Sequence, residues 1–423
     1  MKSLLSGVLL VAILFGVFQT FHVAQVLQEP SLTYATPSNT LVVPDSFAKI
    51  SWAFGNASDG DTVLVRKGTY AEPNLFVNKS LTIVGENAKN TIIDGGGTAQ
   101  FVFHVIASNV VIENFTLQNT AMSFSVQDAA ISVYNATNVK VEDVIIRNVY
   151  YGVEMRSSNF TEITYCNISN SSWSGIWLRS RSSNNTIAGN IIENNHIGIG
   201  FAEATSQFNV IYHNSFVNNT PQISFPGGVD YFDNGYPSGG NYWSDYSGTD
   251  LKHGSSQDQT GSDGIFDESY PVTGDRYPLA NPLTILNVQA GDQAFHMQLS
   301  TNATVTGYEL NISRKGLSLF INDSAGATEA CKTLIPKDLL GCENLTDWII
   351  TFYDNGTGQA LTYLPFEDSK STYLYFTHSG STNGIVEMKG TIVAPELSPA
   401  TMVILLVTAT GFVVVAKKQS RKR

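Results

Sequence analysis

Charged residues are scarce in this chain of 423 residues. They make up 14% of it, against roughly 25% in an ordinary soluble domain. Disordered chains combine high charge with few aromatic residues, and the 11% of aromatic residues here argues against that class. Basic residues are the scarcer sign, with 24 Lys and Arg against 36 Asp and Glu, for a net charge of −12. We therefore expect no nucleic-acid partner.

Cysteine is nearly absent, with three residues in the whole chain. At this length, and with 43% hydrophobic residues, the chain can build real cores and is expected to hold more than one structural unit. A small disulfide-stapled scaffold is excluded. Cys331 and Cys342 are close enough in sequence to close a small loop, so we predict a disulfide between them, with Cys166 left unpaired.

Two long apolar runs stand at the two ends. In residues 1–24, Lys2 is followed by a neutral, mostly apolar run from Ser3 to Phe21, and small residues around Ala24 could supply a cleavage site, as in a secretory signal peptide. Residues 399–416 carry no charge and suffice to cross about 30 Å of hydrocarbon, and residues 417–423 form a basic tail. The positive-inside rule places that tail in the cytoplasm. We predict a single-pass protein of the cell membrane whose bulk is extracellular.

This topology leaves alternatives about processing open. The first run could stay as an uncleaved anchor, and the segment from Val393 to Ala400 resembles a signal for removal of some archaeal C-terminal helices. Without Lys2 and the five cations of the tail, 18 basic residues oppose 36 acidic ones in the external part, which should attract cations. Fourteen Asn-x-Ser/Thr sequons between Asn56 and Asn355 would permit glycosylation.

A repeat of 22 to 24 residues occupies the first half of the chain. Five short segments recur at intervals of 29, 22, 24 and 24 residues, and each ends in asparagine, at Asn119, Asn148, Asn170, Asn194 and Asn218. A second pattern, a small residue followed by alternating apolar positions, recurs at intervals of 22, 23 and 23 residues, at Ala130, Gly152, Gly175 and Gly198. Two independent columns therefore share one period.

The alternation within each repeat is that of a strand with one buried face. Short strands separated by Asn, Gly and Ser corners wind into a coil whose turns stack about 4.8 Å apart, which predicts a parallel β-helix. A propeller needs repeats of about 40 residues or more, and a sandwich does not repeat at fixed positions. Asparagine suits the corners because it tolerates left-handed backbone and its amides can hydrogen-bond along the stack.

Both ends of the repeat carry recognisable segments. The stretch from Ser46 to Asp94 begins with amphipathic residues that predict a short helix capping the open end of the coil. Several segments resemble those of NosD-like β-helix proteins. The entry segments are Phe47 to Tyr70 and Lys79 to Glu86, and the closing segments are GGNYWSDY (239–246), GSDGIFDESY (261–270) and DRYPL (275–279). The resemblance covers about residues 45–283. It implies a right-handed helix, an extracytoplasmic location, and repeats of the carbohydrate-binding and sugar-hydrolase (CASH) type.

Residues 286–390 lack the repeat and contain short alternating runs separated by turn residues. They predict a β-sandwich of about 100 residues, and they look like the small Ig-like domains of archaeal surface proteins. The predicted chain is thus all-β apart from its membrane helix. Its parts are a signal peptide (1–24), a β-helix (45–283), a β-sandwich (286–390), a transmembrane helix (399–416) and a cytoplasmic tail (417–423).

Aligning the repeats places side chains in columns. Three columns follow from the glycine alignment: Asp128, Tyr150, Trp173 and His196; Ser132, Glu154, Trp177 and Gly200; Tyr134, Arg156, Arg179 and Ala202. The last two alternate with buried positions and should point outward. Aromatic faces beside charged groups suit a sugar chain. We predict a polysaccharide or surface glycan on this wall, with Tyr150, Glu154, Arg156, Trp173, Trp177 and Arg179 as candidate binding residues.

Three functions compete for this wall. Stacked aromatics can serve only to stabilise neighbouring coils, which would suit a structural or adhesive envelope protein without a small ligand. A polysaccharide hydrolase or lyase needs paired acid and base groups, and the nearest pairs are Glu154 with Asp128 and Asp143 with Arg147. Neither pair forms an identifiable motif, so glycan binding without catalysis is the preferred hypothesis.

Two metals are candidates. Asp258, Asp263 and Asp267 lie in a Gly-rich loop and form a weak calcium candidate, since calcium prefers oxygen ligands on flexible loops, although Asp-Gly pairs are also common turn formers. Copper is suggested by the family name, but it prefers His, Cys and Met ligands, and the His residues are scattered. We expect no copper site.

Overall fold

The computed structural model describes residues 39–123, 128–224, 227–291, 293–323 and 326–393. The predicted signal peptide, transmembrane helix and basic tail lie outside these residues and stay predictions. Within the described ranges, no helix has the length and apolar character needed to span a bilayer.

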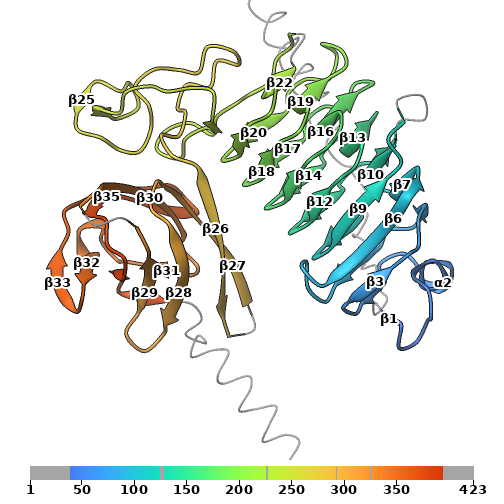
Figure 1. Ribbon diagram of the computed structural model, residues 1–423, viewed down its shortest axis with the longest axis horizontal. Helices are drawn as coiled ribbons and strands as arrows, with labels where there is room; N and C mark the ends of the chain where they lie inside the picture. Colours follow the sequence, from blue (N-terminus) through green and yellow to red (C-terminus); the bar gives the residue numbers. More distant parts are fainter. Residues whose placement is uncertain (1–38, 124–127, 225–226, 292, 324–325, 394–423) are drawn as a thin grey trace, which may run out of the picture. The chain divides into compact units, whose positions relative to one another are not determined.

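The first part is a parallel β-solenoid of the right-handed type, in which each coil contributes one strand to each of three sheets (Figure 1). Sheet A contains β1 (Thr40–Val43), β2 (Thr62–Val65), β5 (Thr82–Gly85), β8 (Val111–Glu113), β11 (Lys140–Glu142), β14 (Glu162–Thr164), β17 (Thr186–Ala188) and β20 (Val210–Tyr212). Sheet B contains β3 (Gly68–Tyr70), β6 (Thr91–Ala99), β9 (Thr116–Thr120), β12 (Ile145–Arg147), β15 (Asn167–Ser169), β18 (Ile191–Glu193), β21 (Ser215–Val217) and β23 (Tyr242–Trp243). Sheet C contains β4 (Leu75–Val77), β7 (Phe101–Val105), β10 (Ala129–Tyr134), β13 (Tyr151–Arg156), β16 (Ser174–Arg179), β19 (Ile197–Phe201) and β22 (Ile223–Ser224).

The solenoid core consists of the inward residues of these short strands. Ile131, Val153 and Ile176 stack in register on β10, β13 and β16, and all three are fully buried. Apolar columns of this kind supply the hydrophobic stabilisation, because each coil covers the next. The predicted alternation is confirmed.

Each coil turns three corners, and the corner residues have left-handed backbone. The A/B corner column contains Asn114, Asp143, Tyr165, Gly189 and His213, with φ between 51° and 70°. The B/C corner column contains Asn119, Asn148, Asn170, Asn194 and Asn218. The C/A corner column contains Asn109, Asn138, Phe160, Asn184 and Phe208. Asparagine is common here because it tolerates this conformation better than other non-glycine residues.

Hydrogen-bonded asparagine ladders also form, and one of them runs through buried asparagines that are not corner residues. Asn190 donates to Asn214, which donates to Asn241, at 2.9 Å each, and all three are buried. The expected bonding between corner asparagines is also present, from Asn138 to Asn109 at 3.1 Å and from Asn218 to Asn194 at 3.4 Å. At the B/C corner, exposed Asn194 turns the chain and buried Asn195 donates along the ladder to Asn219.

Both ends of the solenoid are capped. At the start, helix α2 (Ile50–Asn56) buries Ile50, Ala53 and Phe54 over the first coil, which confirms the predicted capping helix. At the other end, the ring of Trp243 stacks between Phe216 and Tyr270, with ring centroids 4.4 Å apart on both sides. A short hairpin follows, formed by β24 (Lys252–His253) and β25 (Gln259–Thr260).

The second part is a β-sandwich-like pair of antiparallel sheets with its own core, as predicted (Figure 1). One sheet contains β26 (Leu283–Ala290), β27 (Gln293–Thr301), β30 (Thr328–Pro336), β35 (Ser371–Ser379) and β34 (Tyr363–Glu367). The other contains β28 (Val305–Asn311), β29 (Gly316–Ile321), β36 (Gly384–Lys389), β32 (Ile349–Asp354) and β33 (Thr357–Ala360). The 3-10 helix η1 (Leu345–Asp347) and the pair β31 (Leu340–Gly341) and β37 (Ile392–Val393) complete it.

The predicted disulfide between Cys331 and Cys342 is wrong, because all three cysteines are free. Cys331 is buried in β30, which continues in extended form to Pro336, about 17 Å further on. The chain could bring Cys342 back only by pairing beside β30, and Leu340 and Gly341 instead pair with β37.

The hairpin β26–β27 packs against the A/B corner of the solenoid. His296 lies 2.9 Å from Asp143 through Nε2, and its ring stacks on Tyr165 with centroids 3.8 Å apart. Asn287 donates to the same Asp143 carboxylate at 3.2 Å. The sandwich thus covers the A/B corner, which leaves sheet C as a separate face.

Candidate functional site

The predicted columns exist. Strand pairing places Gly152 beside Gly175, and Gly175 beside Gly198. A Cβ atom on Gly152 would lie 2.3 Å from the carbonyl oxygen of Gly175, and one on Gly198 would lie 2.3 Å from that of Gln222. Glycine is required at Gly152, Gly175 and Gly198, because the next coil approaches too closely there for a side chain, whereas the coil before Gly152 has Ala130 at this position.

The outward columns of sheet C are also in the predicted register. Ser132, Glu154 and Trp177 form one row, and Tyr134, Arg156 and Arg179 form the next. The third predicted column stands just before these strands, where Tyr150 and Trp173 stack with centroids 6.2 Å apart. We call this surface the outer face of sheet C.

Most of the predicted site residues pack on one another in what we call the covered cluster: Tyr150, Tyr151, Glu154, Trp173, Trp177 and Arg179. Tyr151 stacks on Trp177 at 5.7 Å, and the Trp177 ring lies over Gly200, where a Cβ would be 2.2 Å from it. Glu154 is only 3% exposed. The outward rows are in the predicted register, but packing within the cluster leaves Glu154 buried and Trp173, Trp177 and Arg179 only partly exposed.

Glu154 is held by two partners. One carboxylate oxygen lies 2.9 Å from Nε of Arg179, and the other accepts from the Ser132 hydroxyl at 3.2 Å. Burial raises the pKa of Glu154, and the opposing influence of Arg179 does not fully offset it. Burial likewise raises the pKa of Asp128, which is fully buried beside this cluster.

A second, open part of the same face contains residues that the sequence alignment missed. We call it the aromatic track: Phe76, Phe101, His104, Tyr134 and Arg156. The His104 ring lies 5.4 Å from Phe76, 4.7 Å from Phe101 and 6.3 Å from Tyr134, and the Arg156 guanidinium lies 5.3 Å over the Tyr134 ring.

The track is accessible where the covered cluster is not. Phe76 is 58% exposed and Tyr134 is 42% exposed, and Arg156 is exposed as well. Burial lowers the pKa of His104, so its imidazole is neutral near pH 7. The repeat alignment could not find Phe76, Phe101 and His104 because they precede the segments in which the sequence period is regular.

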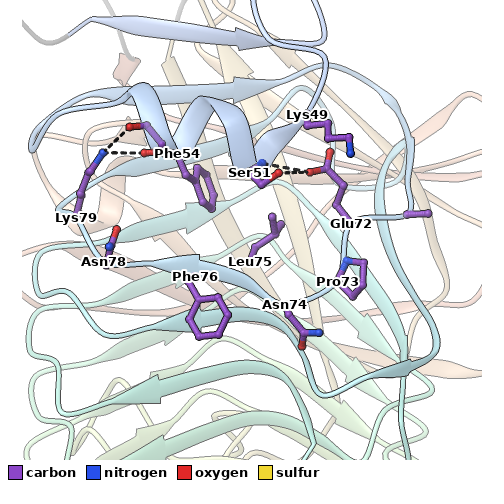
Figure 2. A pocket seen from close by; sticks show the side chains of 12 residues that line it. Lys49, Ser51, Phe54, Glu72, Pro73, Asn74, Leu75, Phe76, Asn78 and Lys79 are labelled. Carbon is purple, nitrogen blue, oxygen red and sulfur yellow. Dashed lines mark hydrogen bonds between the residues drawn. The ribbon is translucent and has the colours of Figure 1, made fainter.

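A hollow of about 590 Å³ lies at the end of this track, between α2 and β4 (Figure 2). Its two hydrogen-bonded charged groups fix the helix. The Glu72 carboxylate accepts from the backbone nitrogens of Ile50 and Ser51, and Lys79 Nζ donates to the carbonyls of Phe54, Gly55 and Ala57. Phe76 lines the hollow and also begins the track.

The predicted calcium ligands are spread over several turns. Asp267 accepts from the backbone nitrogens of Leu251 and Lys252, and Asp263 is buried, with its oxygens bonded to Ile265 N and the Gln257 side chain. Asp258 is exposed. Among the described residues, no three His, Cys, Asp or Glu side chains gather as a metal site would require. The calcium site stays a prediction that chelation can test.

Three of the described histidines have contacts far from one another that do not suit a copper site. His104 lies among the track rings, His296 stacks on Tyr165, and His213 contacts the Ser238 carbonyl at 3.0 Å. Copper sites need such donors to converge, and these do not fit that requirement.

The fold defines a NosD-like parallel β-solenoid, and a family comparison supports this class. Residues 54–248 match the family model described as periplasmic copper-binding protein (NosD). The resemblance is therefore confirmed for residues 54–248, which include the closing segment 239–246 but not the segments 261–270 and 275–279.

Similar solved structures are distant. The catalytic domain of a GH87 α-1,3-glucanase in complex with nigerose shares 16% identity at a TM-score of 0.36, over 49% of this chain and 38% of the glucanase. A PL6 family alginate lyase shares 15% at 0.33, over 42% and 28%, and a pectin methylesterase in complex with a hexasaccharide shares 16% at 0.27, over 42% and 72%. The chain thus spans well under half of the first two, and these likenesses carry no functional weight. No curated protein matches the chain.

Proposed function

We propose that this protein binds a polysaccharide or surface glycan along the outer face of sheet C, through the aromatic track. The observation that carries the proposal is the row of accessible rings that crosses three coils and ends on an exposed guanidinium. The ring centroids on successive coils are 5.4 and 6.3 Å apart, so they offer repeated apolar platforms to an extended sugar chain. Arg156 adds a fork that can bind hydroxyl or carboxylate oxygens.

Binding is better supported than catalysis. A hydrolase or lyase needs an acid or base that reaches the substrate. Glu154 is 3% exposed and both of its oxygens are engaged. In our proposal the covered cluster supports the face on which the track lies, while Arg156, from the predicted set, contacts the glycan.

We further propose that the glycan-binding face is displayed outside a membrane. The basis is the sequence alone, namely the apolar residues 399–416 with the basic tail behind them and the leader at residues 1–24. Fractionation of cells that express the chain with and without residues 394–423 tests this part. Recovery of both forms in the soluble fraction would refute it.

Glycan binding is tested on an array of neutral and uronate-containing polysaccharides with the full chain. Replacing Phe76 and Tyr134 by Ala should weaken binding about tenfold or more, since each ring contact contributes on the order of 1 kcal/mol. The matched control is Trp52→Ala, which removes an exposed ring away from the track. Equal binding by the track variant and the control would contradict the proposal.

A further inference from the structure

The three corner columns of the solenoid differ in how many aromatic residues they contain. The B/C corner is all asparagine over the five coils from Asn119 to Asn218. The A/B and C/A corners each replace asparagine by aromatic rings at two positions. Left-handed backbone is unfavourable for such bulky side chains, so each replacement stores backbone strain. We therefore expect another interaction of the ring to offset that strain.

At the A/B corner, residues from later in the chain contact the two rings. Tyr165 stacks on His296 of the hairpin β26–β27, with centroids 3.8 Å apart and planes 5° apart. His213 is buried against the carbonyl of Ser238. Both strained rings therefore have a partner that covers them.

At the C/A corner, about half of the surface of each aromatic residue is exposed to solvent. Phe160 and Phe208 have φ of 55° and 62° and are 57% and 47% exposed. Neither makes a ring contact with another described residue. Asn184 stands between them in the column, so the two rings lie two coils apart, about 10 Å along the solenoid.

The surroundings of Phe160 indicate the kind of partner. A hollow of about 480 Å³ beside the ring is lined chiefly by hydrogen-bonding side chains, those of Asn138, Lys140, Glu162, Asn184 and Thr186. The hollow where the sandwich meets the A/B corner is instead lined largely by apolar residues, among them Ile145, Ile191, Leu283, Ile285 and Leu286. A protein segment covers the apolar corner, whereas a ring surrounded by polar groups suits a sugar.

We propose that Phe160 and Phe208 form a second carbohydrate-binding row, on the C/A corner, for an uncharged polysaccharide. Lys140 is paired with Glu142 at 2.6 Å, while Glu162 is exposed and Glu113 lies near the same pair. The local balance is negative, which disfavours uronates. The row and the aromatic track consist of different residues, so the two sites can be tested separately with different variants.

The test replaces both rings by the residue that the rest of the column prefers. Phe160→Asn with Phe208→Asn should relieve strain and raise the unfolding midpoint of the full chain, on the order of 2 to 4 °C. The same variant should lose about tenfold in affinity for a bound neutral oligosaccharide. The probes are cellohexaose, xylohexaose, mannohexaose and chitohexaose, measured by titration calorimetry. Phe160→Tyr, which keeps the ring, should bind as the unchanged chain does.

Two results would overturn this row. One is that the unchanged chain binds none of the four probes, and the other is that the double asparagine variant binds them with unaltered affinity. The Phe76 and Tyr134 variant is measured on the same probes. If it loses binding while the asparagine variant does not, the corner row fails and the aromatic track stands.

Discussion

The solenoid and the sandwich both bury apolar strands, but their contacts span the sequence differently. In the solenoid, Gly152 meets Gly175 and Gly175 meets Gly198, always one coil further along the chain. In the sandwich, Cys331 of β30 pairs with Thr301 on one side and Phe376 on the other. A constant period lets the position of one residue predict which residues lie beside it. It also means that the size of each side chain is limited by the coils above and below it.

The largest expected effect comes from the same substitution made in both regions. Gly152→Ala places a Cβ atom 2.3 Å from the backbone oxygen of Gly175 and 2.6 Å from Ile168, so two coils must separate. We expect the free energy of unfolding to fall by about 3 kcal/mol or more. Gly341→Ala meets its nearest neighbour at 3.7 Å and should change stability by less than about 1 kcal/mol. Urea titration of both variants checks the contrast, and comparable losses would show that the stacking constraint is not specific to the solenoid.

The sequence period predicted the positions of residues in the solenoid columns, but it did not predict how the side chains pack on one another. The glycine column, the inward apolar columns and the outward rows follow from spacing alone, because every coil repeats the same geometry. Spacing could not show that the Trp177 ring would lie over Gly200 or that Glu154 would be buried, since both depend on side-chain conformation. It also missed Phe76 and His104, which precede the regular coils.

In the sandwich, the sequence pattern predicts the strands but not their pairing. The alternating runs predicted its strands, but nothing in their spacing predicts which strand pairs with which. Proximity in sequence suggested that Cys331 and Cys342 would bond, whereas Gly341 is paired with Ile392, about fifty residues away. Antiparallel pairings are set by turns and core packing that a single sequence does not display.

The next effect is a pH dependence in the solenoid close to its junction with the closing segment. Burial lowers the pKa of His213 to about 4, against about 6.5 in an unfolded chain. The unfolded state therefore binds the proton first as pH falls, and stability should drop by about 2 to 3 kcal/mol between pH 6.5 and pH 4. His213→Asn removes this titration and keeps a residue that tolerates φ of 53°.

The measurement is the difference in unfolding free energy between the unchanged chain and His213→Asn across that range. Carboxylates elsewhere titrate in both proteins and cancel in the difference. A difference that stays constant from pH 6.5 to pH 4 would mean that His213 is not held neutral by burial.

A smaller effect separates two adjacent asparagines of one coil. Asn195→Ala leaves the backbone nitrogen of Ser171 and the carbonyl of Ile168 without their buried partner, at a cost of about 2 kcal/mol. Asn194→Ala affects an exposed left-handed corner and one exposed bond of 3.4 Å that Asn194 accepts from Asn218, at about 1 kcal/mol. Thermal unfolding of the two variants ranks them, and a larger loss for Asn194→Ala would reverse the assignment of corner and ladder.

The smallest effect is an expected absence of change, and it concerns the sandwich. Because Cys331 and Cys342 are free, a reducing agent should leave the unfolding midpoint unaltered. Burial raises the pKa of the Cys331 thiol to about 12, so iodoacetamide should modify Cys331 only after denaturation, while partly exposed Cys342 reacts in the native state. A native chain that resists alkylation at both positions, and that loses about 3 kcal/mol of stability on reduction, would instead carry the disulfide that the sequence suggested and would require β31 to leave its pairing with β37.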